Sequence, residues 1–90
     1  MQRARIIVHG LVQGVFYRAF TKKNAEELGL KGFVRNMPDG SVEIIAEGEE
    51  KSINSLVTRL RQGPSSASVQ KVDVNKEEAT NEFSGFEIRR

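Results

Sequence analysis

The residues of this sequence best suited to chemistry lie in one glycine-rich segment, GLVQGVFYR, at residues 10–18. The segment joins a stretch with strand periodicity to a stretch with helix periodicity. A glycine-rich turn in this position can point several backbone N–H groups into one concavity, and the first helical turn adds a partial positive charge. Arg18 contributes a planar guanidinium whose donors match two oxygens of a phosphate group. The segment therefore predicts a site for a phosphate-sized anion.

Two familiar phosphate-binding motifs are absent from this segment. The Walker pattern GxxxxGK[ST] does not occur, and neither does the Lys that such a loop places on a β- or γ-phosphate. The pattern GxGxxG is also missing, so a dinucleotide is not implied. Two glycines in such a loop can also serve backbone geometry alone, and an early helical Arg can simply be solvated.

Hydrophobic periodicity predicts the strands that position the segment. Residues 3–9 alternate Ala4, Ile6 and Val8 with more polar neighbours, as a half-buried strand does. Pro38 and Gly40 in MPDGS predict a hairpin turn. The remaining predicted strands are residues 32–36, 41–47, 69–75 and a short last strand in FSGFEIRR.

Two helices are predicted between these strands. The first begins near Tyr17 and ends near Gly29, with a stripe made of Tyr17, Phe20, Asn24 and Leu28, and with Ala25 beside it. The second carries apolar residues at helical spacing and ends before Gly63-Pro64. Its apolar residues are Ile53, Leu56, Val57 and Leu60.

This order of elements predicts an α+β fold, the ferredoxin-like βαββαβ sandwich, over a single domain of residues 1–90. Two helices should cover one face of a mostly antiparallel sheet that carries a short extra C-terminal strand. The strands that flank the first helix should run parallel with one strand between them, so their ends lie about 10 Å apart at one edge. Asn36 ends the second of these strands. We therefore expect Asn36 and Arg18 to face one small volume.

Composition limits the function further. The chain has no Cys and one His, so thiolate sites and the usual zinc ligand sets cannot form, and we expect no metal and no cofactor. Lys and Arg number 14 against 12 Asp and Glu, without a concentrated basic face, which disfavours nucleic acid as a partner. No apolar run is long enough to span a membrane. The absence of Cys favours the cytoplasm, and no extended apolar patch is indicated, so we expect a monomer. Because the chain starts at Met1 and ends just after its last strand, we also expect a free-standing protein.

The chain resembles the acylphosphatase family. The resemblance rests on VHGLVQGVFYR at residues 8–18 and GFVRNMPDGSVE at residues 32–43, and it continues through EGEE, QGP and GFEI to cover nearly the whole chain. It implies that Arg18 binds phosphate and that Asn36 orients the attacking water. It also implies that the phosphate-binding loop consists of Leu11, Val12, Gln13, Gly14, Val15, Phe16 and Tyr17. Leu11 departs from the family, which more often has Arg or Lys there.

The resemblance implies a metal-free hydrolase that cleaves acyl phosphates to a carboxylate and inorganic phosphate. Its carboxylate leaving group departs without a general acid, because the conjugate acid has a pKa of about 4. The loop reads mainly the phosphate, so the sequence does not specify the acyl group.

Other residues and other functions were weighed against this hypothesis. His9 is expected to be structural, Asn24 to form a buried hydrogen bond, and Asp39 to belong to the PDG turn. KGFVRN begins like an RNA-recognition motif, but Val34 stands where the motif has Gly or Ala, Arg35 stands where it has an aromatic residue, and the segment lies on the wrong strand. The remaining alternative is a noncatalytic ferredoxin-like domain that binds an anion or a partner.

Overall fold

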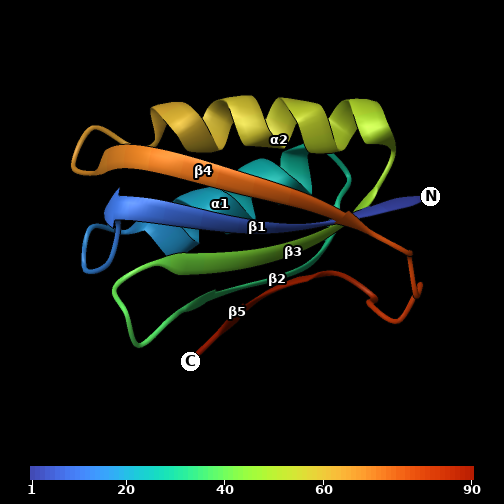
Figure 1. Ribbon diagram of the computed structural model, residues 1–90. Helices are drawn as coiled ribbons and strands as arrows, with labels where there is room; N and C mark the ends of the chain where they lie inside the picture. Colours follow the sequence, from blue (N-terminus) through green and yellow to red (C-terminus); the bar gives the residue numbers. More distant parts are fainter.

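The chain folds into five strands and two helices in the predicted order, and a computed structural model describes all of residues 1–90 (Figure 1). The strands and helices are β1 (Gln2–Leu11), α1 (Tyr17–Glu27), β2 (Lys31–Asn36), β3 (Val42–Gly48), α2 (Glu50–Gln62), β4 (Ser68–Glu77) and β5 (Phe86–Arg89). Neither helix is both long enough and apolar enough to cross a membrane.

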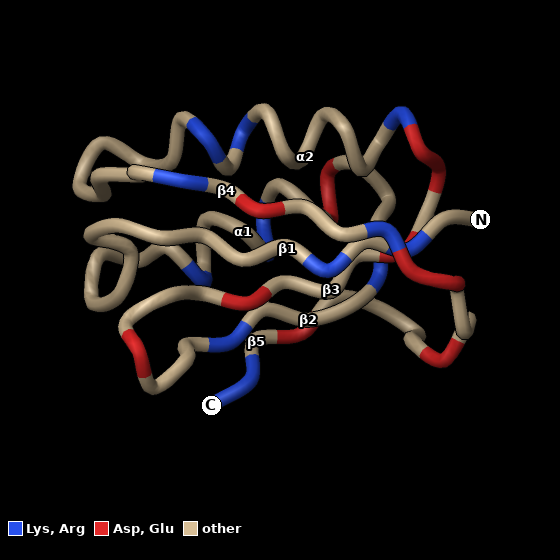
Figure 2. Tube along the Cα trace, in the orientation of Figure 1, with Lys and Arg blue, Asp and Glu red and all other residues tan.

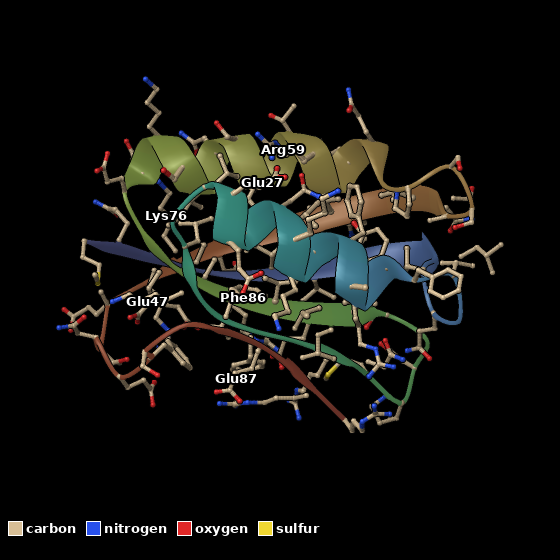
Figure 3. All side chains as sticks on the ribbon, turned by 180° about the vertical axis from the view of Figure 1, so that it is seen from behind. Glu27, Glu47, Arg59, Lys76, Phe86 and Glu87 are labelled. Carbon is tan, nitrogen blue, oxygen red and sulfur yellow. The ribbon has the colours of Figure 1, made fainter.

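The strands form one sheet in the order β4-β1-β3-β2-β5. Strand β5 pairs parallel with β2, and every other pairing is antiparallel. Both helices cover the same face, as the views from the two sides show (Figures 1 and 3). This is the predicted ferredoxin-like sandwich with its extra C-terminal strand, and β1 and β2 run parallel on either side of β3 as expected.

The core lies between the sheet and the helices. Ala4, Ile6 and Val8 of β1 are fully buried, which confirms the predicted alternation. In α2 the residues Ile53, Leu56 and Leu60 are buried, also as predicted. These side chains join one cluster of 15 buried residues that reaches from the helices to Phe86 of β5.

The buried stripe of α1 differs from the predicted one. Tyr17, Thr21 and Ala25 are buried, whereas Phe20 and Leu28 are only partly buried at the edge of the core. Thr21 tolerates burial because its hydroxyl donates a 2.8 Å hydrogen bond to the carbonyl of Tyr17, one turn earlier. The prediction thus included Tyr17 and Ala25 but missed Thr21, whose hydroxyl finds its partner within the helix.

Strand β1 continues two residues beyond its predicted end and pairs with β4 through Leu11. The register shifts between His9 and Gly10, where Gly10 has a φ of 131°. A Cβ at Gly10 would overlap the backbone carbonyl of Ser68. The first glycine of the segment therefore permits a close approach of two strands, and the loop itself begins after Leu11.

Basic and acidic residues are interspersed along the strands of the sheet (Figure 2), and two glutamates of β3, Glu43 and Glu47, are buried. Glu43 accepts hydrogen bonds from Arg5 and Arg35. Burial alone raises the pKa of Glu43, but these two arginines outweigh it and hold the pKa below its usual value. The two cations thus keep a buried carboxylate ionised.

Glu47 lies at the end of the sheet far from the start of α1 (Figure 3). Its carboxylate accepts hydrogen bonds from Arg3 at 3.1 Å and from the backbone N–H groups of Thr80 at 2.8 Å and Asn81 at 3.0 Å. Burial alone raises the pKa of Glu47, yet the bonds from Thr80 and Arg3 lower it overall. Glu47 therefore fixes the segment that leads into β5.

Candidate active site

A cavity of about 330 Å³ lies where the loop after β1, the start of α1 and the ends of β2 and β5 meet. The side chains and backbone that line it are those of Val12, Gly14, Phe16, Tyr17, Arg18, Ala19, Asn36, Ile88 and Arg90. The structure therefore brings Arg18 and Asn36 into one cavity, together with four of the seven residues predicted for the loop. No Asp or Glu side chain lines it, so its charged side chains are both arginines.

The register of the sheet explains why Asn36 faces this cavity. Asn36 lies opposite Val42 of β3, and Val42 lies opposite Val8 of β1. Residues directly opposite each other in a sheet share a face, and Val8 and Val42 are both buried beneath the helices. Asn36 consequently projects from the helix-covered face at the edge where β1 gives way to the loop.

The amide oxygen of Asn36 is buried but accepts no hydrogen bond from the protein. A buried acceptor left without a donor destabilises a fold by about 1–3 kcal/mol. Such groups are rare in native structures and require an explanation. Here the oxygen belongs to a residue that lines the cavity, so a donor bound in the cavity can satisfy it.

Arg18 lies in the first turn of α1 and is partly buried. Its Nη1 donates a 3.2 Å hydrogen bond to the backbone carbonyl of Arg89 in β5. No carboxylate forms an ion pair with Arg18, so its charge remains available to an anion. The link to β5 holds the side chain at the cavity without neutralising it.

The backbone of the loop turns sharply before α1. Gly14 has a φ of 73°, a conformation that suits glycine, and there is open space where a Cβ would lie. Phe16 also adopts the left-handed conformation, with φ 62° and ψ 21°. The second glycine of the segment is thus required for its dihedral angle, in contrast to Gly10.

Contacts on both sides hold the loop in this shape. The hydroxyl of Ser66 donates a 3.0 Å hydrogen bond to the carbonyl of Val15, and the buried hydroxyl of Tyr17 donates a 2.7 Å bond to the carbonyl of Leu60. Burial raises the pKa of the Tyr17 phenol, which stays protonated as a donor. Tyr17 therefore anchors the loop to α2.

The remaining three predicted loop residues lie outside the cavity lining. Leu11 is an exposed residue at the end of β1, and Val15 packs against the core. Gln13 donates 2.8 Å hydrogen bonds from Nε2 to the carbonyls of both Met37 and Ser41. The Gln13 side chain therefore ties the loop to the turn that follows Asn36, and it is not directed at a ligand.

Two residues of the C-terminal end, Ile88 and Arg90, complete the cavity, and the sequence analysis did not predict them as site residues. Ile88 lies opposite Val34 in the parallel pairing of β5 with β2, so it faces the helix-covered side. Arg90 follows two positions later and also lines the cavity. The short strand showed alternation, but alternation does not reveal which neighbour a strand chooses. Ala19 was also missed, since it carries no reactive group.

Other polar residues lie away from the cavity. His9 contacts Asp73 at 3.3 Å on the open face. Asp39 accepts hydrogen bonds from the hydroxyl and N–H of Ser41, which lower its pKa. Asn24 is partly buried between the Phe20 carbonyl and the Arg59 guanidinium. No group of three or more His, Cys, Asp or Glu side chains is placed to hold a metal ion.

Comparison with known proteins relates this geometry to a family. The family model described as acylphosphatase matches residues 4–88. The chain belongs to the acylphosphatase family. An acylphosphatase of Methylococcus capsulatus is 47% identical over all of this chain and 98% of its own length. An acylphosphatase of Acaryochloris marina is 50% identical over 96% of this chain and 91% of its own.

A solved structure agrees with these relatives. The crystal structure of acylphosphatase from Bacillus subtilis has a TM-score of 0.96 against this chain, at 37% identity and with both chains covered completely. The family resemblance predicted from the two motifs is confirmed by these comparisons.

Proposed function

We propose that the cavity beside Arg18 and Asn36 is where this member of the acylphosphatase family hydrolyses acyl phosphates to a carboxylate and inorganic phosphate. The observation that carries the proposal is that one cavity contains an unpaired arginine, a buried acceptor without a donor, and a tight loop at a helix N-terminus. Each feature suits one part of the reaction.

The reaction needs few catalytic groups. Water attacks phosphorus, a new P–O bond forms, and the bond between phosphorus and the acyl oxygen breaks. The electron pair of the broken bond leaves with the carboxylate, and a phosphate oxygen takes the proton of the water. Because the leaving carboxylate has a conjugate acid with a pKa of about 4, it departs unprotonated. Catalysis then depends on positioning and on stabilising charge at the phosphoryl oxygens.

Arg18 supplies this charge stabilisation. Its guanidinium pairs with two phosphoryl oxygens, and backbone N–H groups of the loop from Val12 to Tyr17 bind the others. The first turn of α1 adds its partial positive charge. Arg18 gains this role because it has no carboxylate partner that an incoming anion must displace.

Asn36 orients the attacking water. The buried amide oxygen accepts a hydrogen bond from the water, which satisfies an acceptor that the protein leaves without a donor. Gln13 supports this arrangement by fixing the turn after Asn36 to the loop. The water and the phosphate are thereby held by parts of the chain that are directly linked.

We also propose that the protein acts on a small-molecule substrate, as a monomer in the cytoplasm. Only five large apolar side chains are exposed, and two of them line the cavity. The remaining surface therefore offers no extended apolar patch for a subunit contact.

The test is hydrolysis of benzoyl phosphate, followed by ultraviolet absorbance with EDTA and without added metal. We expect turnover by the wild type that EDTA does not change. Arg18→Ala should lower kcat/KM by about 10³-fold or more, since a preorganised charged donor is lost. Arg61→Ala, which removes an exposed arginine at the end of α2, is the matched control and should retain full turnover.

Two results would contradict the proposal. A folded wild type without turnover above background would favour the noncatalytic anion-binding alternative. Equal activity of the wild type and the Arg18→Ala variant would show that the reaction takes place elsewhere.

A further inference from the structure

We propose that Phe16 and Ile88 form an acyl-binding wall of the active site, so that the enzyme prefers acyl phosphates with an aromatic or extended apolar acyl group over acetyl phosphate. The proposal rests on the proposed function and extends it to the part of the substrate that the loop motif does not read. Both residues line the cavity that contains Arg18 and Asn36.

The cavity is larger than a phosphate group requires. At roughly 30 Å³ per water molecule, its volume of about 330 Å³ corresponds to roughly ten waters. A phosphate group occupies only part of this space. The acyl group is joined to the phosphate through one oxygen, so it must lie in the remainder of the same cavity or at its mouth.

The remainder of the cavity has an apolar wall. The large apolar side chains that the chain leaves exposed are Met1, Leu11, Phe16, Val74 and Ile88. Phe16, at 80%, is the most exposed of them, and Ile88 is exposed at 39%. Their presence on one cavity concentrates apolar surface beside the charged groups. Ligand sites typically combine such apolar walls with a few polar groups that fix orientation.

The conformation of Phe16 is a second, independent observation. A bulky side chain rarely adopts the left-handed conformation, because its Cβ then comes too close to the carbonyl oxygen that follows. The contacts of Val15 with Ser66 and of Tyr17 with Leu60 enforce it from both sides. Strain of this kind clusters at ligand-binding sites. Here the strained residue lines the cavity, and its aromatic side chain is exposed instead of packed in the core.

Ile88 reaches the cavity by a different route. It continues the helix-facing row of β5 that begins with Phe86, and the parallel register aligns it with Val34. Phe86 is buried, whereas Ile88, two residues further along the strand, is partly exposed and lines the cavity. The wall therefore combines a residue from the loop with one from β5, which approach the cavity from different elements.

The experiment compares kcat/KM for benzoyl phosphate and acetyl phosphate, measured by phosphate release. The specificity ratio is kcat/KM for benzoyl phosphate divided by kcat/KM for acetyl phosphate. The two substrates differ in intrinsic reactivity, but this difference is the same for every variant and cancels when their ratios are compared. We expect Phe16→Ala to lower the ratio about tenfold and Ile88→Ala about threefold, as loss of apolar contact to the benzoyl ring predicts. In both variants, kcat/KM for acetyl phosphate should fall less than kcat/KM for benzoyl phosphate, because the small acetyl group makes fewer contacts with the wall. Competitive inhibition by inorganic phosphate is measured beside these assays.

Two further variants separate substrate contact from folding. Phe16→Asn removes the ring but tolerates the left-handed backbone, so it should fold and lower the ratio like Phe16→Ala. Val74→Ala is the matched control, because Val74 is an exposed apolar strand residue at 37% that does not line this cavity. Its specificity ratio should equal that of the wild type.

A ratio unchanged in both Phe16 variants would overturn the proposal. An equal decrease in kcat/KM for both substrates, together with weaker inhibition by phosphate, would also overturn the proposal. Phe16 would then act through the shape of the phosphate-binding loop and not through contact with the acyl group. A wild type that hydrolysed neither substrate would instead contradict the proposed function itself, which the ratio presupposes.

Discussion

Arginines on the two sides of the sheet have opposite surroundings. On the open face, Arg5 and Arg35 share Glu43, and Arg3 contacts Glu47, Glu77 and Glu82. At the cavity, Arg18 contacts only a backbone carbonyl, and the oxygen of Asn36 has no protein donor at all. Polar groups that stabilise the fold are satisfied internally, and those at the cavity are left for a ligand.

Asn36→Ala provides the largest test of this contrast. We expect kcat/KM for benzoyl phosphate to fall by about 10²–10³-fold, because the water loses its orienting acceptor. Stability should be unchanged or slightly higher, since the substitution removes a buried acceptor without a donor. The steady-state assay measures the change in kcat/KM, and urea unfolding measures the change in stability. A variant that lost stability and kept its activity would reverse the contrast.

Glu47→Ala should show the opposite pattern. The free energy of unfolding should fall by about 2–3 kcal/mol, because the N–H groups of Thr80 and Asn81 and the guanidinium of Arg3 lose their shared acceptor. Turnover at a temperature where the variant is folded should remain near that of the wild type. Chemical denaturation and the benzoyl phosphate assay measure the two quantities.

The control for this experiment is Glu50→Ala. Glu50 forms a single exposed ion pair with Lys76 at 2.8 Å, and such pairs contribute about 0–1 kcal/mol. If the two variants lost equal stability, burial and multiple hydrogen bonds would not be the reason for the effect of Glu47.

The smallest effect is a change in the pH dependence of stability. Glu43 and Glu47 have pKa values in the folded protein below the unfolded value of about 4.3. The unfolded state then binds more protons in acid, so their contribution is complete above that value and is lost as the pH falls through the folded pKa values. In the double variant Glu43→Gln/Glu47→Gln, we expect the urea midpoint of unfolding to fall less steeply than in the wild type as the pH decreases below about 4.5. If the urea midpoint of the double variant fell as steeply with pH as that of the wild type, other carboxylates would be responsible for the loss of stability in acid.

Local pattern was enough to predict the order of elements and the meeting of Arg18 with Asn36. Asn36 ends one of the two strands that flank the first helix, Arg18 lies in the first turn of that helix after the other strand, and the fold type places the two strand ends at one edge. The catalytic roles of these residues and of the loop remain predictions, which the experiments above address.

Features that depend on pairing between distant segments could not be predicted in this way. The sequence did not indicate that Glu43 and Glu47 are buried, because their burial depends on arginines and backbone groups supplied by other strands and by the segment before β5. Ile88 and Arg90 join the cavity only because β5 pairs with β2. Gln13 was predicted as a residue of the phosphate-binding loop, but the sequence did not indicate that its side chain donates to two carbonyls across the turn.

The bond from Arg18 to the carbonyl of Arg89 joins residues 71 positions apart. Contacts of such separation close large loops, and their entropic cost delays them until much of the chain is already ordered. A collapsed chain with both helices formed but β5 undocked would therefore lack one wall of the cavity and the support of Arg18. We therefore predict that, during refolding, enzymatic turnover recovers only once β5 has docked, and later than the helical signal.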